Sequence, residues 1–410
     1  MIAMKKSLLF RRRVDLWLMG LASVLFPLYM RGPVGLVGLF GVSGIYVAFS
    51  RRDRMRDHVF SAYGFVLLYA FWALLLIALR HEMELGNRQM GFMILLSGLT
   101  FVGPGLCLVR RPLRVLVLGT RVGTLIALLL VLGVILFDPH MERYDGGGNA
   151  AIVALLLALG AICATIHLDR PPRFLPNGLQ YLAIACVAVF MTETRAVLVV
   201  LPVIFLAEMV FMSMRWRAPL RNGCYVAALV AVVILALMPP VQAMLADRFG
   251  TVYAYYVEGA PQADMISGDI RLTMWRSAVT VIAAHPFTGV GLMDMFDHLK
   301  RVAGADAGLI DGFKHVHNFI LQELLANGVF GLILLSCIPV AFLWTVLKYS
   351  AENSMKRVAF YFFLTVMMFG LLHDPFYHEL CMSTTMLFFA AYMAQFRRWR
   401  MLTPAATKTV

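Results

Sequence analysis

The sequence predicts an all-α integral membrane protein with about twelve transmembrane helices and one long loop outside the membrane that contains short helices of its own. Hydrophobic residues make up 61% of the 410 residues and charged residues only 14%, whereas soluble domains average nearer half and a quarter. The apolar residues form blocks of about 15–22 residues, long enough to cross a bilayer of roughly 30 Å. Backbone groups inside lipid must pair within their own segment, so these blocks predict helices.

The blocks follow one another along the chain with charged or turn-forming residues between them. The first comes directly after a basic start and has no small-residue cleavage site behind it, so we expect an uncleaved span rather than a signal peptide. The spans are expected at residues 15–30, 33–50, 59–79, 90–109, 115–137, 150–167, 179–193, 196–213, 223–242, 317–347, 358–373 and 380–396.

The distribution of basic residues predicts that both ends of the chain lie in the cytoplasm. With that orientation the inside segments carry 24 Lys and Arg, and the outside segments carry 11 although they include the longest loop. This is the bias of the positive-inside rule. Arg121 lies within a span near its cytoplasmic end, where we expect its side chain to snorkel to the interface. The net charge of +13 therefore indicates basic membrane loops next to lipids and no nucleic-acid partner.

This topology divides the chain into four parts. Residues 1–242 are expected to hold nine transmembrane helices, residues 243–316 an outer loop domain, residues 317–396 three more transmembrane helices, and residues 397–410 a cytoplasmic tail. A loop of this length without a function is uncommon, so the outer loop domain is the natural place for chemistry.

The outer loop domain contains a predicted amphipathic helix that begins near Ser267 and ends at Pro286. Arg271 and His285 fall on the face that also carries Ile270, Met274, Ala278, Val281 and Ile282, whereas Arg276 points the opposite way. The helix could lie on the bilayer, with Arg271 reaching phospholipid head groups. Alternatively, Arg271 could grip an anionic substrate group, because a guanidinium fits phosphate oxygens well.

The segment HPFTGVG, His285–Gly291, follows this helix. Pro286 ends the helix, and Gly289 and Gly291 permit a tight turn. On its own the segment is an ordinary helix stop in which His285 is a polar cap.

The segment HVHN, His315–Asn318, opens the tenth predicted span. Two histidines two residues apart project differently on a helix, so at most one of them need face a site. No third ligand has suitable spacing, so we expect no metal ion. A histidine at a membrane mouth can act as a general base, and a structural role is about equally consistent with the residue types.

Two further polar turns lie on the predicted outer side. Arg195 ends the TETR turn between two closely spaced spans, and it is either a functional residue or an interfacial anchor. The segment HDPFYHE, His373–Glu379, caps the last helical hairpin, and we favour a polar turn over a part of the site.

Arg195, Arg271 and His317 are far apart in the sequence but share the predicted outer side. A transferase that uses lipid diphosphate sugars requires such a set. Cations stabilise the charge on the departing diphosphate, and a base removes the proton from the attacking hydroxyl.

Three motifs together resemble those of the bacterial O-antigen ligase and polymerase superfamily. They are TETRA at 192–196, RLTMWRSA at 271–278 leading into HPFTGVG, and HVHNFILQELLANGVFG at 315–331. The resemblance covers mainly residues 190–345. It implies a GT-C-like fold and an O-antigen ligase of the Gram-negative inner membrane, with a periplasmic active site. The implied donor is a polysaccharide on undecaprenyl diphosphate, and the implied acceptor is a sugar hydroxyl of the lipid A–core oligosaccharide. The implied reaction inverts the anomeric centre and needs no metal, nucleotide or other cofactor.

The motif match also implies residue roles. His317 would be the general base and Arg195 and Arg271 would bind the diphosphate, with four supporting residues: His315, Asn318, Arg276 and His285. The chain departs from the ligase pattern at Thr194, where ligases often have serine.

Other functions stay open at this point. An O-antigen or exopolysaccharide polymerase shares the scaffold and the donor, and Arg301 to Gly312 fits one R-x10-G pattern of such enzymes, although one match is expected by chance among 32 glycines. A protein O-oligosaccharyltransferase is usually longer than this chain. A glycolipid transporter would need repeated halves or charges at mid-membrane, and Glu208 lies toward the cytoplasmic end of its span.

Overall fold

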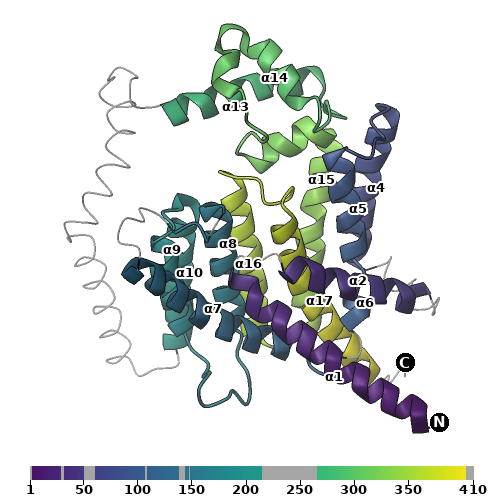
Figure 1. The fold of residues 1–410 in the computed structure, drawn as a ribbon, viewed down its shortest axis with the longest axis vertical. Helices are drawn as coiled ribbons and strands as arrows, with labels where there is room; N and C mark the ends of the chain where they lie inside the picture. Colours follow the sequence, from purple (N-terminus) through teal and green to yellow (C-terminus); the bar gives the residue numbers. More distant parts are fainter. Residues whose placement is uncertain are drawn as a thin grey trace.

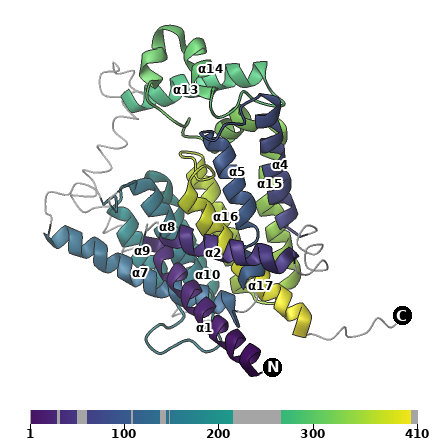
Figure 2. The same ribbon diagram turned by 45° about the vertical axis from the view of Figure 1, so that its right-hand side comes forward.

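The computed structural model describes residues 2–28, 32–49, 61–106, 109–137, 144–146, 148–214 and 266–402. Every regular element in these ranges is a helix (Figures 1 and 2). In chain order they are α1 (Ile2–Leu25), η1 (Phe26–Leu28), α2 (Gly32–Phe49), α4 (Tyr63–Leu79), α5 (Arg88–Leu99), α6 (Val102–Gly105), α7 (Pro112–Phe137), α8 (Ala150–Ala164), α9 (Gln180–Phe190), α10 (Arg195–Ser213), α13 (Ile266–Ala284), α14 (Met295–Ala303), η4 (Gly304–Ile310), α15 (Phe319–Tyr349), α16 (Asn353–Gly370) and α17 (Glu379–Leu402).

A helix lies at each predicted span that falls within the described residues, and the predicted span 223–242 lies outside them. Four described helices are long and apolar enough to cross a membrane, and they contain Gly32–Phe49, Pro112–Val134, Ala196–Ser213 and Phe319–Tyr349. The described part of the chain is therefore all-helical, with helices suited to span a membrane. The total of twelve spans stays a prediction.

The predicted span 90–109 contains two helices, α5 and α6, with a turn at Thr100 and Phe101 between them. Pro104 explains the break, because a proline inside a helix lacks a donor and its ring clashes with the carbonyl four residues earlier, here that of Thr100.

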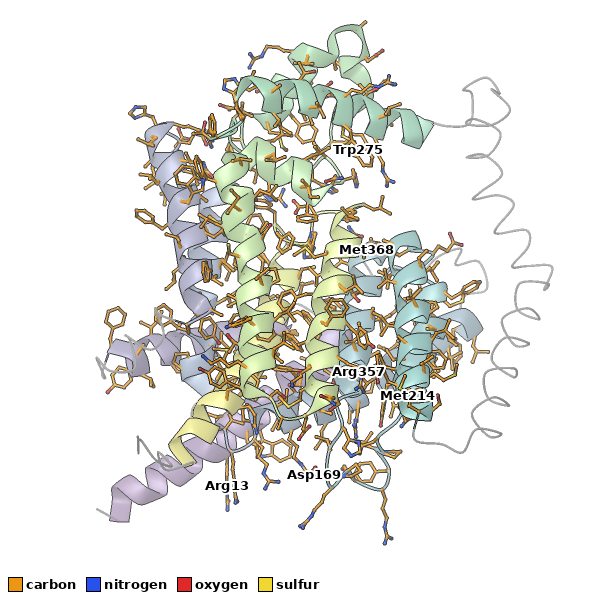
Figure 3. All side chains as sticks on the ribbon, turned by 180° about the vertical axis from the view of Figure 1, so that it is seen from behind. Arg13, Asp169, Met214, Trp275, Arg357 and Met368 are labelled. Atoms are coloured by element: carbon orange, nitrogen blue, oxygen red, sulfur yellow. The ribbon has the colours of Figure 1, made fainter. Side chains whose placement is uncertain are left out.

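Most helices form one bundle in the lower part of Figure 1, in which α16 and α17 lie between the α4–α5–α15 side and the α7–α10 side. All fifteen residues of α8 are buried, which explains why this helix is apolar all round. Figure 3 places Arg13, Asp169 and Arg357 at the end of the bundle opposite Trp275. This arrangement agrees with the predicted orientation, which itself stays a prediction.

Arg121 does not snorkel to the interface as expected. It is 0% exposed, and its guanidinium donates hydrogen bonds to the carbonyl oxygens of Ala164, Ile166 and Leu175 and to Oδ1 of Asn177, at 2.8–2.9 Å. The charge stays buried because it satisfies carbonyls that the end of α8 and the following loop leave unpaired. Arg121 therefore holds the α8–α9 connection against α7.

Residues 266–316, which we call the cap, stand above the bundle (Figure 1). They contain α13, α14 and η4 and have a separate apolar core around Met274, Ala278 and Val281. The predicted apolar face of α13 is therefore confirmed, and Arg276 is exposed on the other side. The face packs against protein instead of resting on lipid. His285, expected on the same face, is exposed beyond the last turn of α13.

The cap joins the bundle where α15 is kinked, at Gly328. Gly328 has φ 68° and ψ −170°, a conformation open essentially only to glycine. The break releases the carbonyls of Leu325, Ala326 and Asn327 from the helix. The backbone N–H groups of Val290 and Gly291 donate to the first of these carbonyls, Arg80 to the second and the Trp72 indole to the third.

The HPFTGVG segment supplies the two contacts to Leu325 because it turns as predicted. Gly289 and Gly291 have φ of 64° and 89°. The N–H of Val329 also donates to the carbonyl of Pro286 at 2.9 Å. The segment is thus a connector between cap and bundle, beyond the ordinary helix stop that it resembles by itself.

Candidate functional site

Three imidazoles meet at the junction of cap and bundle, and we call them the imidazole cluster: His315, His317 and His373. The ring centroids of His315 and His317 are 4.0 Å apart, and His373 lies 5.1 Å from the first and 5.5 Å from the second. His315 lies at the end of the cap and His317 just after it, before α15, whereas His373 comes from the α16–α17 loop, residues 371–378. The ring of Phe369 stacks on His373 at 5.0 Å.

On a helix, at most one of the first two histidines need face the site, but both rings belong to the cluster. The helix α15 begins only at Phe319, after both histidines. Between the two rings, Val316 is 0% exposed in the cap core, and its carbonyl accepts a hydrogen bond from the Trp275 indole at 2.8 Å. Because the backbone here is not helical, neighbouring side chains point to opposite sides and both imidazoles face the cluster.

The backbone holds His317 in an uncommon conformation. Its φ is 55°, a left-handed value that costs a non-glycine residue about 1–3 kcal/mol and is enriched at functional sites. Asn318 follows as the N-cap of α15, and its side-chain oxygen accepts from the N–H groups of Ile320 and Leu321 at 3.0 and 3.2 Å. The N-capping side chain of Asn318 therefore fixes the backbone turn that orients the His317 ring.

Burial is the largest influence on all three imidazoles. It lowers the pKa of His315 to about 4, together with Arg88, Arg271 and His378. Burial, His315 and Arg271 lower the pKa of His317 to about 3, against a small rise from a hydrogen bond with the backbone of Leu372. Burial and the neighbouring rings lower the pKa of His373 to about 3. All three rings are therefore neutral at pH 7 and able to accept a proton.

The Nδ1 atoms of these rings are buried and have no hydrogen-bond partner among the described residues. Each ring offers one ligand atom within 4.8 Å of the others, so the fold supplies the third imidazole that spacing alone did not reveal. Two guanidiniums nevertheless act on the cluster, Arg88 from α5 and Arg271 from α13. Positive charge on two sides opposes a dication and favours an anion.

The other predicted site residues differ in position. Arg271 lies within electrostatic reach of all three imidazoles and lowers their pKa values. Arg276 is exposed, and His285 is exposed beside His298 with ring centroids 5.8 Å apart; neither joins the cluster. Arg195 begins α10, and its side chain lies outside the described part of the structure.

A buried polar network supports the loop that carries His373. The carboxylate of Glu323 accepts hydrogen bonds from the hydroxyls of Tyr69 and Tyr377 and from the amide of Asn327, at 2.8–3.2 Å. Gln89 donates to Oδ1 of Asn327 at 2.7 Å and accepts from the N–H of Leu292 at 3.0 Å. Tyr377 thereby ties residues 371–378 to α4 and α15, and Gln89 ties α5 to the cap. The network therefore fixes the position of the loop that carries His373 relative to the cap.

Residues 180–336 match the protein family described as O-Antigen ligase. This segment of the chain is therefore similar to the O-antigen ligase family. No curated protein matches the chain. The family match and the apolar helices together indicate a multi-pass membrane protein. The family match also indicates a glycosyltransferase-like enzyme that acts on polysaccharide and lipid-linked substrates.

The O-antigen ligase segment contains Arg271, His315 and His317 but ends before His373. This explains why sequence reasoning missed the third imidazole: the motifs that carry the resemblance stop near residue 345. The signal available was the HDPFYHE turn on the predicted outer side, with two histidines and two acidic residues in seven positions. The sequence favours a polar turn there, whereas the fold places His373 in the imidazole cluster.

Proposed function

We propose that this protein is an O-antigen ligase. It would transfer a polysaccharide from undecaprenyl diphosphate to a sugar hydroxyl of the lipid A–core oligosaccharide at the periplasmic side of the bacterial inner membrane. The observation that carries the proposal is the neutral imidazole of His317, held in left-handed backbone beside Arg271. A base next to a fixed cation suits proton removal coupled to departure of a diphosphate.

In the proposed step, the acceptor hydroxyl oxygen attacks the anomeric carbon of the donor sugar. The bond from that carbon to the diphosphate oxygen breaks as the new glycosidic bond forms, with inversion. The hydroxyl proton passes to His317, and undecaprenyl diphosphate leaves with the bonding electron pair. Arg271 stabilises the charge on the leaving group, and Arg195 is assigned the same role by motif match. No metal ion is assigned a role.

The low pKa of His317 fits this role once the substrate is considered. A base with a pKa of about 3 is neutral in the empty site but accepts a proton weakly. A bound diphosphate places negative charge beside Arg271 and so offsets part of the lowering. Donor binding would thus raise the pKa of His317 toward the working pH at the moment when a base is needed.

The proposal is tested first with His317→Ala. We expect a folded protein whose transfer rate is lower by about 10²–10⁴, the usual contribution of a general base. The matched control is His167→Ala, which removes an exposed imidazole from the opposite end of the bundle. Normal transfer by well-folded His317→Ala enzyme would exclude His317 as the base.

A second test is Arg271→Lys, with Arg301→Lys on the exposed side of α14 as its control. Lysine keeps the charge but loses the two-pronged geometry that matches phosphate oxygens. We expect weaker donor binding and slower transfer for Arg271→Lys only. Unchanged donor affinity would count against a diphosphate contact. Chelation of divalent metals in the same assay should leave the wild-type rate unchanged.

Lipopolysaccharide gels distinguish a ligase from a polymerase of the same superfamily. Deletion of a ligase removes the ladder on lipid A–core while lipid-linked polymer accumulates. Deletion of a polymerase leaves a single capped unit on the core, and that pattern would refute the ligase assignment.

A further inference from the structure

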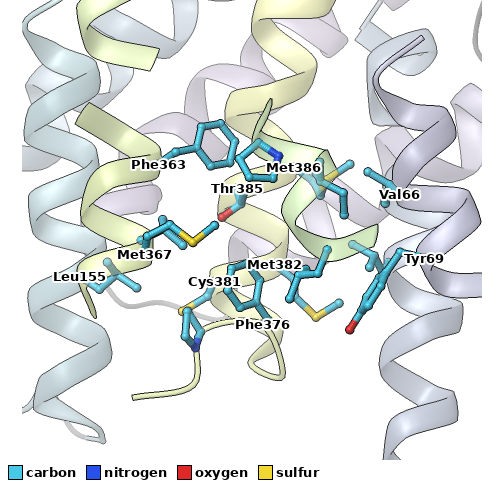
Figure 4. A pocket seen from close by; sticks show the side chains of 16 residues that line it. Val66, Tyr69, Leu155, Phe363, Met367, Phe376, Cys381, Met382, Thr385 and Met386 are labelled. Atoms are coloured by element: carbon cyan, nitrogen blue, oxygen red, sulfur yellow. The ribbon is translucent and has the colours of Figure 1, made fainter. Parts of the chain in front are cut away.

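The helices α4 and α15 present an apolar surface to the outside of the bundle. On the inner side of α4, Val66 and Tyr69 are buried and line a small apolar cavity between the helices (Figure 4). The residues on the opposite side of α4 are apolar and exposed: Leu68, Phe71, Leu75 and Leu79. One side of α15 likewise exposes Phe330, Ile333, Val340, Trp344 and Leu347. Helices that are apolar both inside and outside the bundle are expected to face lipid tails on the outside.

This apolar surface continues onto the HPFTGVG segment that connects the cap to the bundle. Phe287 in that segment is 60% exposed. The centroid of its ring lies 5.9 Å from that of Phe330 in α15, and the Phe330 ring lies 5.6 Å from the half-buried ring of Trp72 in α4. Three aromatic rings from three separate segments thus form a row that leads from the spans to the cap.

Phe287 lies at the level where the apolar side of α4 ends. Leu79 is the last residue of α4, and the guanidinium of the following residue, Arg80, donates a hydrogen bond to the carbonyl oxygen of Thr288. On the cap, the polar residue His285 is exposed only two positions before Phe287. The change from apolar to polar residues therefore falls at the same level on both segments. Such a level is expected at the surface of a bilayer, where segments lying in the interface bury Trp, Phe or Leu side chains in lipid.

We propose that Phe287 inserts into the bilayer leaflet on the side of the cap and docks the cap onto the membrane surface. The partner is the lipid bilayer itself, because the exposed ring continues a surface that α4 and α15 already present to lipid. The contact differs from the one expected from the sequence, since the face of α13 around Met274 packs inside the cap and the turn after α13 meets the lipid instead. The inference is independent of the reaction assigned to the imidazole cluster.

The test compares how fast single cysteine variants react with a charged, water-soluble maleimide in phosphatidylcholine nanodiscs, after subtraction of the wild-type signal. Phe287→Cys is the test variant. Its position is held by the backbone hydrogen bonds from Val329 to Pro286 and from Val290 to Leu325, so the thiol reports the surroundings of residue 287. Ile333→Cys is the lipid-facing control on α15, and Ala305→Cys is the water-facing control on the cap; both positions are exposed.

We expect Phe287→Cys and Ile333→Cys to react about tenfold more slowly than Ala305→Cys, because only the thiolate reacts and apolar surroundings suppress it. A reaction of Phe287→Cys as fast as that of Ala305→Cys would place residue 287 in water and overturn the inference. A slow reaction together with cross-linking of two chains through Phe287→Cys by a bifunctional reagent would show that a second copy covers this surface, and would overturn it as well.

Labelling of the wild-type protein gives an independent measurement that needs no substitution. A phosphatidylcholine with a photoreactive group in its acyl chain is included in the nanodiscs, and the modified residues are found by mass spectrometry. We expect adducts within residues 285–291 and on the exposed side of α15, but none within residues 300–310. Adducts on α15 without any within residues 285–291 would overturn the proposed docking of the cap.

Discussion

Substitution of Gly328 by alanine tests the account of how the cap is attached. Gly328 has φ 68° and ψ −170°, where a side chain costs about 1–3 kcal/mol of backbone strain. A Cβ atom there would lie 2.1 Å from the carbonyl oxygen of Phe287 and 2.5 Å from the nitrogen of Thr288. Neither contact is tolerable, so the HPFTGVG segment must move away from α15.

That movement disrupts the hydrogen bonds from Val329 to Pro286 and from Val290 to Leu325, at 2.9 and 2.7 Å. Each is worth about 0.5–1.5 kcal/mol. With the strain, the expected loss is about 2–6 kcal/mol of unfolding free energy, a large part of the 5–15 kcal/mol typical of folded proteins. Transfer should weaken as well, because the displaced segment connects the bundle to the cap, and His315 lies in the cap.

The assay is the thermal transition of purified enzyme in detergent, followed by size-exclusion chromatography after heating. We expect Gly328→Ala to lower the midpoint by on the order of 5–10 °C. The control is Gly133→Ala in α7, where an added Cβ meets nothing within 4 Å and alanine favours the helix by about 0.5–1 kcal/mol. If Gly328→Ala and Gly133→Ala both unfold at the midpoint temperature of the wild-type protein, the proposed attachment of the cap through Gly328 is wrong.

Three further predictions follow from the site and the bundle. Arg271→Gln should raise the pKa of His317 from about 3, because a repelling cation is removed. Since the base must be unprotonated, kcat/KM of the variant should fall at a higher pH than that of wild type, measured from about pH 4 to pH 8; superimposable acid limbs would contradict this. Asn318→Ala should cost about 1 kcal/mol of stability and reduce kcat. Asn318→Asp keeps a capping oxygen and should retain the wild-type kcat. A kcat equal to wild type in Asn318→Ala would show that Asn318 does not position His317. Arg121→Met should cost about 3 kcal/mol or more, since three buried carbonyls lose a charged donor, with kcat per folded molecule unchanged; a thermal midpoint equal to wild type would refute the role of Arg121.

Local chemistry was sufficient to predict several features. The apolar face of α13 depends only on spacing along one helix, so Met274, Ala278 and Val281 were identified correctly. The turn of HPFTGVG depends on glycines whose backbone freedom is intrinsic. The position of helices at the predicted spans depends on the length of apolar blocks, which is itself a local property.

Other features required contacts between distant segments. His373 joins His317 only because the Glu323 network fixes the α16–α17 loop against α4 and α15. Arg121 is buried because carbonyls 43–54 residues away need donors. The break at Gly328 exists because the cap returns to pair with the carbonyls that it exposes.

The sequence by itself determined the class of protein and two of the residues in the imidazole cluster. These follow from hydrophobicity, charge and spacing, which act between near neighbours in the chain. Only the tertiary structure decided the third imidazole and the second cation that acts on the cluster. Such features arise where elements distant in sequence satisfy one another's polar groups and leave space between their side chains, and no local pattern encodes that pairing.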